Sequence, residues 1–364
     1  MPDVRPVLDL VEAVHVVVPF RHPFEAAHGV FTTRDSWIVR IGDRDGRQGF
    51  GEVALDPSAS AADLAAIGRA VREVADLLAD GLTPDWSGRG GSGQIGRAVR
   101  AGVDSALEWL ALDPSTGSAS LSVAVNATLG HSDPGEAAAA AVGAVAAGFS
   151  TLKVKVVGAE SPVGLSARLT AIRRAVGGSI KLRLDANCSW DLATAVGRLN
   201  ALAEYDIEYV EQPLAADDVD GHAILRRETP VHVALDESVT DEAAAWRILD
   251  AGAADVLVVK LARIGGPEVG RAIAARAAAA GVPVVLSTFF ETGVGTVAAL
   301  RAAADLPRVD EERAHGLATA DILEHDLLST PLVVAAGRIT LPASLLVDCE
   351  ALDRYEVGRI GRGQ

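Results

Sequence analysis

Lysine is scarce in this 364-residue chain, because only four of its 33 basic residues are lysines. The other basic residues are arginines, and a guanidinium is too basic to exchange its proton with a substrate. We therefore expect lysine where a titratable amine is needed, at Lys153, Lys155 and Lys260, which each lie near the end of a short apolar run. Lys181 is expected to be an ordinary surface residue, and chance retention is the alternative explanation for the other three.

Positive charge is also in short supply, since 49 acidic residues give the chain a net charge of −16. This charge argues against nucleic acids and anionic membrane surfaces as partners. A small anionic carboxylate substrate would need a local positive pocket. The sequence leaves the oligomeric state open, and a homo-oligomer is compatible with it.

Cysteines and long apolar runs are the remaining scarce features. The two cysteines, Cys188 and Cys349, lack the spacing of a metal site, and so few cysteines indicate a reducing compartment. No signal-peptide pattern and no apolar run of roughly 18 residues occurs. We therefore expect a soluble, cytoplasmic protein.

The first third of the chain has the pattern of an α+β domain. Apolar and polar residues alternate as in strands, and two later segments have helical spacing. The expected strands are 11–18, 36–41 and 48–53, and the expected helices are 61–79 and 96–111. A long aromatic loop is predicted at 20–33, and a Gly/Ser-rich joint at 87–93.

From about residue 122 onward, short strands alternate with Ala-rich helices. The expected strands are 123–127, 152–156, 181–185, 207–211, 231–236, 256–260 and 283–287, and the helices include 133–147, 161–176, 191–203 and 267–280. Seven or eight such units predict a parallel sheet closed into a barrel. A doubly wound open sheet is the competing fold, but the segment 126–130 lacks its Gly-rich turn.

Acidic residues end three consecutive predicted strands. Asp185, Glu211 and Asp236 are followed, at the end of the next strand, by Lys260. The carboxyl ends of barrel strands form one rim, where active sites of this architecture lie. Three converging carboxylates repel one another unless a divalent cation binds them, and hard oxygen ligands favour Mg²⁺, with Mn²⁺ as a substitute. Alternatively, each carboxylate caps the helix that follows it.

The lysines suggest proton transfer at this rim. Lys153 and Lys155 are two residues apart on one strand, so their side chains share a face, and we expect the two ammonium groups to depress each other's pKa. Lys260 should approach from the opposite side of the barrel. A substrate held between these amines is suited to loss of a proton next to a carboxylate, with the metal and a retained ammonium stabilising the enediolate.

Five motifs occur in an order that resembles the muconate-lactonizing branch of the enolase superfamily. They are Thr151-Leu-Lys-Val-Lys155, Asp185-Ala-Asn187, Tyr209-Val-Glu-Gln-Pro213, Leu235-Asp-Glu-Ser238 and Val259-Lys260. The resemblance implies a (β/α)7β TIM-like barrel over 119–325. It also implies an α+β capping domain formed by residues 1–118 and a C-terminal segment, 326–364, that returns to it.

The same resemblance implies roles for individual residues. Asp185, Glu211 and Asp236 would bind Mg²⁺, and Lys155 and Lys260 would face the substrate α-carbon from opposite sides. Lys155 would be the base, and Lys153 would tune the charge beside it. Asn187 and Glu237 match positions that orient the metal site and Lys260.

The choice of reaction depends on the later segments. Acid-sugar dehydratases and mandelate racemase-like members typically use a late histidine as base, and none stands at the position of Lys260. Residues 287–295 and 314–319 look like the corresponding segments of o-succinylbenzoate synthases, the menaquinone-pathway members. Dipeptide epimerases commonly carry an Asp-x-Asp pair near the last strand, where this chain offers only Asp321. We therefore expect syn dehydration of 2-succinyl-6-hydroxy-2,4-cyclohexadiene-1-carboxylate.

Several residues are candidates for contact with the substrate. Arg21, on the predicted loop, is expected to pair with a substrate carboxylate, with a solvated arginine as the alternative. Ser287 and Thr288 precede a helix start and are expected to bind a carboxylate. Of Phe289 and Phe290, one should be a core residue and the other a pocket wall. His315 is expected to be structural.

Three other functions are compatible with these residues. A racemase or epimerase of N-acyl amino acids, such as N-succinyl amino acids, or of dipeptides would use the same two lysines as acid and base. A Schiff-base aldolase would use Lys260 as its nucleophile. A non-catalytic scaffold would leave the placement of the lysines without an explanation.

Overall fold

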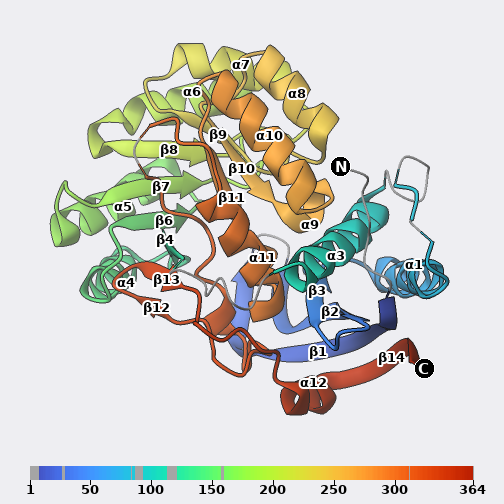
Figure 1. Ribbon diagram of the computed structural model, residues 1–364. Coiled ribbons are helices and arrows are strands. Elements are labelled where there is room, and N and C mark those ends of the chain that lie inside the picture. The colour runs from blue at the N-terminus through green and yellow to red at the C-terminus, as the bar shows by residue number, and fades with distance from the viewer. Residues whose placement is uncertain are drawn as a thin grey trace.

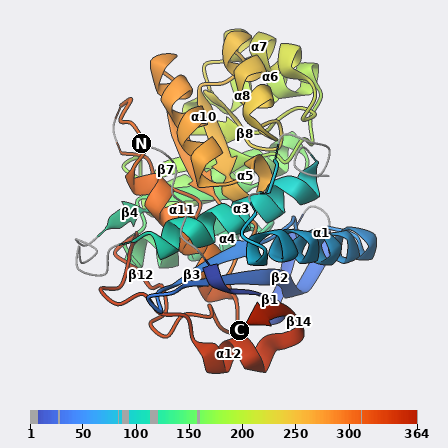
Figure 2. The same cartoon turned by 45° about the vertical axis from the view of Figure 1, so that its right-hand side comes forward.

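The computed structural model (Figure 1) describes residues 8–26, 29–82, 84–86, 93–112, 121–156, 160–310 and 312–363. Within these ranges, no helix is both long and apolar enough to cross a membrane. Most of the predicted joint at 87–93 lies outside the described residues. The chain forms an antiparallel cap and a parallel barrel, which lie against each other in both views (Figures 1 and 2).

The cap is a four-stranded antiparallel sheet with two helices on one face. Its strands β1 (Leu8–Ala26), β2 (Gly29–Asp43), β3 (Gln48–Val53) and β14 (Glu356–Gly363) lie in the order β14-β1-β2-β3. Figure 2 shows helices α1 (Ala61–Ala79) and α3 (Gln94–Leu110) between this sheet and the barrel. A Cβ atom on Gly51 would lie 1.9 Å from the carbonyl oxygen of Gly102, so glycine is what allows α3 to approach β3 this closely.

The predicted loop at 20–33 was wrong, because the described part of this segment continues the β1–β2 hairpin. Phe24 pairs with Phe31, after a register shift between Pro19 and Phe24. Proline removes a ladder donor and is tolerated at edges and irregularities of a sheet, which explains why the strand survives with two prolines. The backbone amide of Glu324 donates to the carbonyl of Pro19 at 2.8 Å, so the hairpin also contacts the barrel.

The barrel contains seven parallel strands, as the periodicity predicted, and six of them lie at the predicted positions. They follow one another around the sheet in chain order: β5 (Ala127–Leu129), β6 (Thr151–Lys155), β7 (Lys181–Asp185), β8 (Ile207–Glu211), β9 (Val233–Leu235), β10 (Val256–Lys260) and β11 (Val284–Ser287). The ring closes through a two-residue eighth strand, in which His315 bridges Val125 and Gly316 bridges Ser287. The predicted (β/α)7β barrel with an α+β cap is therefore present.

Helices cover the outside of the barrel. They are α4 (Pro134–Ala146), α5 (Pro162–Val176), α6 (Leu192–Ala201), α7 (Val219–Glu228), α8 (Glu242–Asp250), α9 (Leu261–Ile264), α10 (Pro267–Ala279) and α11 (Gly293–Ala304). Several begin where the sequence supplies a capping side chain: Ser161, Asp191 and Asp241 each accept a hydrogen bond from a first-turn amide. These caps end the loops that follow the strands.

The predicted strand at 123–127 is divided in two. Its first part, β4 (Ser122–Ala124), leaves the barrel and pairs with β13 (Arg338–Thr340), which also pairs with β12 (Val334–Ala335). The C-terminal segment thus contacts the base of the barrel before α12 (Cys349–Tyr355) and β14 return to the cap. Strand periodicity continues through both parts, so it did not reveal the change of partner.

Candidate active site

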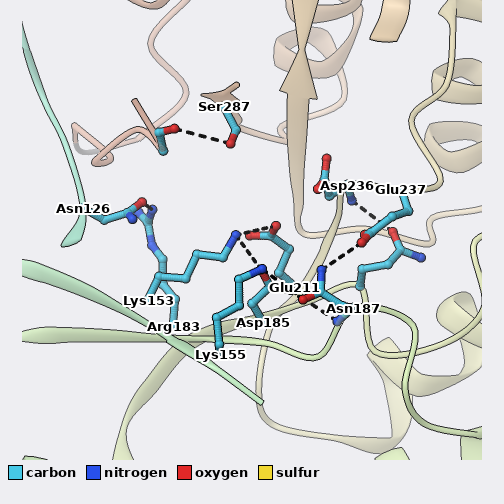
Figure 3. A network of polar contacts seen from close by, with 12 residues as sticks. Asn126, Lys153, Lys155, Arg183, Asp185, Asn187, Glu211, Asp236, Glu237 and Ser287 are labelled. Carbon is cyan, nitrogen blue, oxygen red and sulfur yellow. Dashed lines mark hydrogen bonds and ion pairs between the residues drawn. The ribbon is translucent and has the colours of Figure 1, made fainter. Parts of the chain in front are cut away.

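The predicted rim residues line one cavity of about 310 Å³, except Glu211, which contacts it through Lys153 (Figure 3). The strand register pairs Lys155 with Asp185 and Asp185 with Glu211, and on the other side of the barrel it pairs Lys260 with Ser287. The lining comes from both sides of the ring and from the cap: it includes Lys153, Lys155, Asp185, Asp236, Glu237 and Lys260, together with Phe31 and Asp56. Charged residues predicted from strand ends thus meet in space.

On the β6 side, the two lysines bind the acidic residues of the neighbouring strands. The Nζ atom of Lys153 lies 2.7 Å from Oε1 of Glu211 and 2.8 Å from Oδ2 of Asp185. The Nζ atom of Lys155 lies 2.7 Å from the same Oδ2 and donates to Oδ1 of Asn187 at 3.0 Å. Asn187 in turn donates to Glu237 at 3.0 Å. The polar network therefore runs continuously from β6 to the β9 side.

On the opposite side, Asp236 is held by two cations. Lys260 donates to Oδ2 of Asp236, and Arg263 donates to Oδ1 at 2.6 Å. Arg263 is a functional candidate that the sequence reasoning missed, although its place one helical turn after Lys260 was a usable signal. The ring of Phe289 lies 5.3 Å from Nζ of Lys260 and 4.9 Å from Cζ of Arg263, a cation–π arrangement that fixes this corner.

The charges of these groups follow from burial and from their partners. Burial disfavours the charge of Lys153, but Asp185, Glu211 and Asp236 outweigh it, and the pKa of Lys153 is raised well above its ordinary value. The expected depression by a neighbouring ammonium is therefore wrong for Lys153. Burial raises the pKa of Glu211 to about 7, with the charges of Asp185 and Asp236 adding to the effect and Lys153 opposing it.

The other two carboxylates shift the other way. Burial would raise the pKa of Asp185, but Lys153 and Lys155 outweigh it and the pKa falls below its usual range. Arg263 and Lys260 similarly outweigh burial at Asp236 and lower its pKa. Two ionised carboxylates therefore flank one, Glu211, that is costly to ionise.

Gln212 ties the acidic strands together. It is fully buried, and its φ of 41° places a non-glycine residue in the left-handed region. Its Oε1 accepts hydrogen bonds from the amides of Asp236 at 3.0 Å and Ser238 at 3.1 Å, and its Nε2 donates to Oγ of Ser238 at 2.8 Å. On the other side, its carbonyl accepts from the amide of Cys188 at 2.7 Å. One side chain thus sets the position of Asp236 relative to Glu211.

The residues at this rim fit a hard divalent cation. Among the described residues, no three acidic, histidine or cysteine side chains are already gathered around one point, because the carboxylates face the lysines and Arg263 instead. Four carboxyl groups nevertheless stand close together, and the buried Oε2 atom of half-buried Glu237 has no hydrogen-bond partner among the described atoms. Oxygen donors in this number, partly unsatisfied, match the preference of Mg²⁺.

The residues predicted to contact substrate divide into two groups. Ser287, Thr288, Phe289 and Phe290 line the cavity, with Phe289 the more deeply buried of the two rings. Arg21 does not line it; the residue is exposed and donates to the backbone carbonyls of residues 321 and 324 at 2.9 and 3.2 Å. Because the hairpin was predicted as a loop, this contact with the barrel could not be foreseen.

His315 has a structural role, as expected. Its Nδ1 accepts a hydrogen bond from the amide of Leu286 at 3.0 Å, and its backbone joins the short eighth strand to β4. Burial, together with the charge of Arg183, lowers the pKa of His315 to about 4. The ring therefore stays neutral near pH 7.

Comparison with known proteins identifies the family. The family model described as "Enolase C-terminal domain-like" matches residues 136–345, which is more than half of the chain. The chain belongs to the enolase superfamily. Among superfamily members, the hydrophobic dipeptide epimerase of Enterococcus faecalis is 31% identical over 331 residues, covering 86% of this chain and 93% of that one. The resemblance predicted from the five motifs is thus confirmed.

Other relatives include an o-succinylbenzoate synthase and a dipeptide epimerase of known structure. The o-succinylbenzoate synthase of Thermobifida fusca is 40% identical over 216 residues, but the match covers 59% of this chain and 65% of that enzyme, slightly less than two thirds. A solved dipeptide epimerase from Enterococcus faecalis, complexed with Mg and the dipeptide L-Leu-L-Tyr, gives a TM-score of 0.76 at 28% identity and covers 93% of this chain and 98% of that one. This chain is therefore an enolase-superfamily enzyme with both lyases and isomerases among its relatives.

Proposed function

We propose that the chain is an o-succinylbenzoate synthase: it would convert 2-succinyl-6-hydroxy-2,4-cyclohexadiene-1-carboxylate to o-succinylbenzoate and water in menaquinone biosynthesis. The main support for this proposal is that the cavity lining that follows the eighth strand is uncharged. Gly316, Ala318, Thr319 and Ile322 line it and offer no charge, while Asp321 is exposed and is not part of the lining. A substrate ammonium would find no carboxylate there, whereas a neutral or anionic side chain can be accommodated.

Lys155 would remove the proton next to the ring carboxylate and return it to the departing hydroxyl group. The C–H bond breaks, its electron pair forms the enediolate, and loss of the C–O bond then gives water and an aromatic ring. Both transfers occur on one face, so a single amine suffices. Lys260, across the cavity, would remain an ammonium and stabilise the developing negative charge.

The acidic rim would complete the charge balance. Asp185, Glu211 and Asp236 would hold Mg²⁺, with Mn²⁺ as a substitute, and the bound ion would stabilise negative charge on the substrate carboxylate. Lys153 would stay charged between Asp185 and Glu211, since its pKa is raised. Asn187 and Glu237 would orient the side chains around the rim through their mutual hydrogen bond. Ser287 and Thr288 would bind substrate, and Phe289 would form a wall.

We assign the capping domain and the catalytic barrel to three segments of the chain. Residues 1–118 and 326–364 would form the capping domain, and residues 119–325 would form the catalytic barrel. The pairing of β1 with β14 supports this assignment.

A racemase or epimerase is the second candidate. The longer match to the dipeptide epimerase of Enterococcus faecalis favours it, as does the placement of Lys155 and Lys260 in one cavity. In that reaction each lysine would serve as acid for one enantiomer and as base for the other. The two candidates share the enzyme's rim and differ in what the rest of the pocket binds.

The experiment that separates them is a parallel assay of purified protein with Mg²⁺ against the diene, N-succinyl amino acids and dipeptides. The synthase proposal expects formation of o-succinylbenzoate from the diene. Absence of that product, together with racemisation of N-succinyl amino acids and solvent deuterium exchange at the α-carbon of both enantiomers, would overturn it. Borohydride trapping with substrate would instead indicate the Schiff-base reaction.

A further inference from the structure

Asn126, which lines the deep part of the cavity, and Arg183, which is buried behind it, form a polar pair to which the reaction above gives no part (Figure 3). Asn126 lies just before β5, is 4% exposed and lines the cavity. Arg183 is fully buried on β7, one inward-facing position deeper than Asp185. Its NH1 atom donates to Oδ1 of Asn126 at 3.2 Å. The pair therefore forms part of the floor beneath Lys153.

The amide of Asn126 has a single orientation that satisfies this contact. A guanidinium only donates hydrogen bonds, so the amide oxygen must face Arg183 and the Nδ2 group must face away from it. Within the described ranges, Nδ2 donates no hydrogen bond and is accessible from the cavity, whereas NH2 of Arg183 is buried without a partner. Because Asn126 is only 4% exposed, a ligand oxygen that accepts from Nδ2 would form a hydrogen bond largely shielded from water.

A buried cation, Arg183, lies directly behind Asn126. Glu208 is bound by Nε of Arg183 at 2.6 Å and by NH1 of Arg313 at 2.9 Å, and Nζ of Lys181 lies 3.7 Å away. Glu208 is thus shared between Arg183 and Arg313, and Arg313 also pairs with Asp310 at 2.5 Å. The ring of Tyr209, 4.6 Å from Cζ of Arg183, shields the guanidinium from water. Low dielectric strengthens the attraction of an anion to this end of the cavity and the repulsion of a cation.

We propose that Asn126, oriented by Arg183, binds the second carboxylate of the substrate, the one remote from the abstracted proton. The inference rests on the proposed synthase function, because that substrate is a dicarboxylate. It adds a specificity-determining contact at the floor of the cavity. The Nδ2 donor of Asn126, with Arg183 behind it, would also disfavour substrates that present an ammonium group at this place. Asn126 contacts substrate directly, and Arg183 acts through Asn126 as a positioning residue.

The test is calorimetric binding of two probes to the Mg²⁺-loaded protein. o-Succinylbenzoate carries the second carboxylate, whereas benzoate lacks it. For Asn126→Asp, which keeps the contact with Arg183 but turns an acceptor toward the cavity, we expect o-succinylbenzoate to bind at least about tenfold more weakly. Benzoate should bind to this variant as it does to the unmodified protein.

Asn126→Ala provides a second variant, since NH1 of Arg183 keeps its hydrogen bond to the carbonyl of Ala314 at 2.7 Å. It should weaken o-succinylbenzoate binding alone, with an unchanged affinity for benzoate as the check on folding. Asn200→Asp, the same change on an exposed helix position, is the matched control and should alter neither probe. Unchanged binding of o-succinylbenzoate to both Asn126 variants would overturn the inference and leave the proposed function intact. Failure of the unmodified protein both to bind o-succinylbenzoate and to convert the diene would overturn both.

Discussion

The Nζ atom of Lys155 lies 2.7 Å from Oδ2 of Asp185, so the amine proposed as base and a carboxylate proposed as metal ligand share one contact. Lys153 binds the same oxygen at 2.8 Å. A cation that binds Asp185 must compete with both ammonium groups, and its arrival would release Lys155 from the carboxylate. Cation binding and availability of the base are therefore expected to be linked.

Replacement of Lys155 tests the role of its amine. Lys155→Arg keeps a positive charge beside Asp185 but removes a group that can exchange protons, so kcat for dehydration should fall by about 10² to 10⁴. Binding of o-succinylbenzoate, measured by calorimetry, should change much less. Lys181→Arg is the matched control and should retain activity. Near-normal turnover by Lys155→Arg would remove Lys155 from the reaction.

Gln212 should be needed for cation affinity. Gln212→Ala removes the side chain that holds the amides of Asp236 and Ser238, so Asp236 loses its fixed position. Loss of such a supporting contact typically weakens metal binding by about 10- to 100-fold. Titration of the metal-free variant with Mg²⁺ measures this directly, and the exposed Gln48→Ala serves as control. Equal Mg²⁺ affinities would show that the strand positions do not depend on Gln212.

Glu52 should hold the cap on the barrel. Its buried carboxylate accepts hydrogen bonds from Ser36 at 2.7 Å and, at the start of α11, from the hydroxyl of Thr292 at 2.6 Å and the amide of Gly295 at 3.1 Å. Glu52→Ala should lower the free energy of unfolding by roughly 2–4 kcal/mol, because these buried donors lose a charged acceptor. Urea denaturation compares it with the exposed Glu73→Ala. Similar stabilities of the two variants would contradict this role.

Glu291 should make stability depend on pH. Burial raises its pKa to about 7, with Glu52 adding to the shift and Arg34 opposing it. A raised folded-state pKa contributes stability that is present below the unfolded value and is lost as pH rises through the folded value. The metal-free protein should therefore lose on the order of 2–3 kcal/mol relative to Glu291→Gln between the ordinary pKa of glutamate and about pH 7.

Urea unfolding of both proteins across this range measures the difference. The exposed Glu204→Gln should follow the unmodified protein throughout. A difference that stayed constant with pH would show that Glu291 titrates normally.

The rim of the site could be predicted because each of its residues ends a strand. Lys155, Asp185 and Glu211 are adjacent in register, which follows from parallel strands whose ends share one side of a barrel. Long-range choices of partner could not be predicted in this way. The departure of β4 to β13 depends on residues more than 200 positions away, and periodicity carries no information about them.

Side-chain contacts also could not be predicted from the sequence. The raised pKa of Lys153 arises because its ammonium lies between Asp185 and Glu211, whereas spacing alone brings it only beside Lys155. The position of Arg263 was visible one turn after Lys260, but its target, Asp236, depends on how α9 leaves β10. In the sequence, Asn126 drew attention only because the segment 126–130 lacks a Gly-rich turn. Its contact with Arg183 joins strands on different parts of the ring and could not be predicted.

Metal-dependent dehydration is tested by conversion of the cyclohexadiene substrate by purified protein, followed spectroscopically with Mg²⁺, after EDTA, and after Mg²⁺ is restored. We expect o-succinylbenzoate to form with Mg²⁺, its formation to stop after EDTA, and its formation to resume when the ion is returned. Absence of o-succinylbenzoate under all three conditions, from protein that binds Mg²⁺ and racemises N-succinyl amino acids, would contradict it.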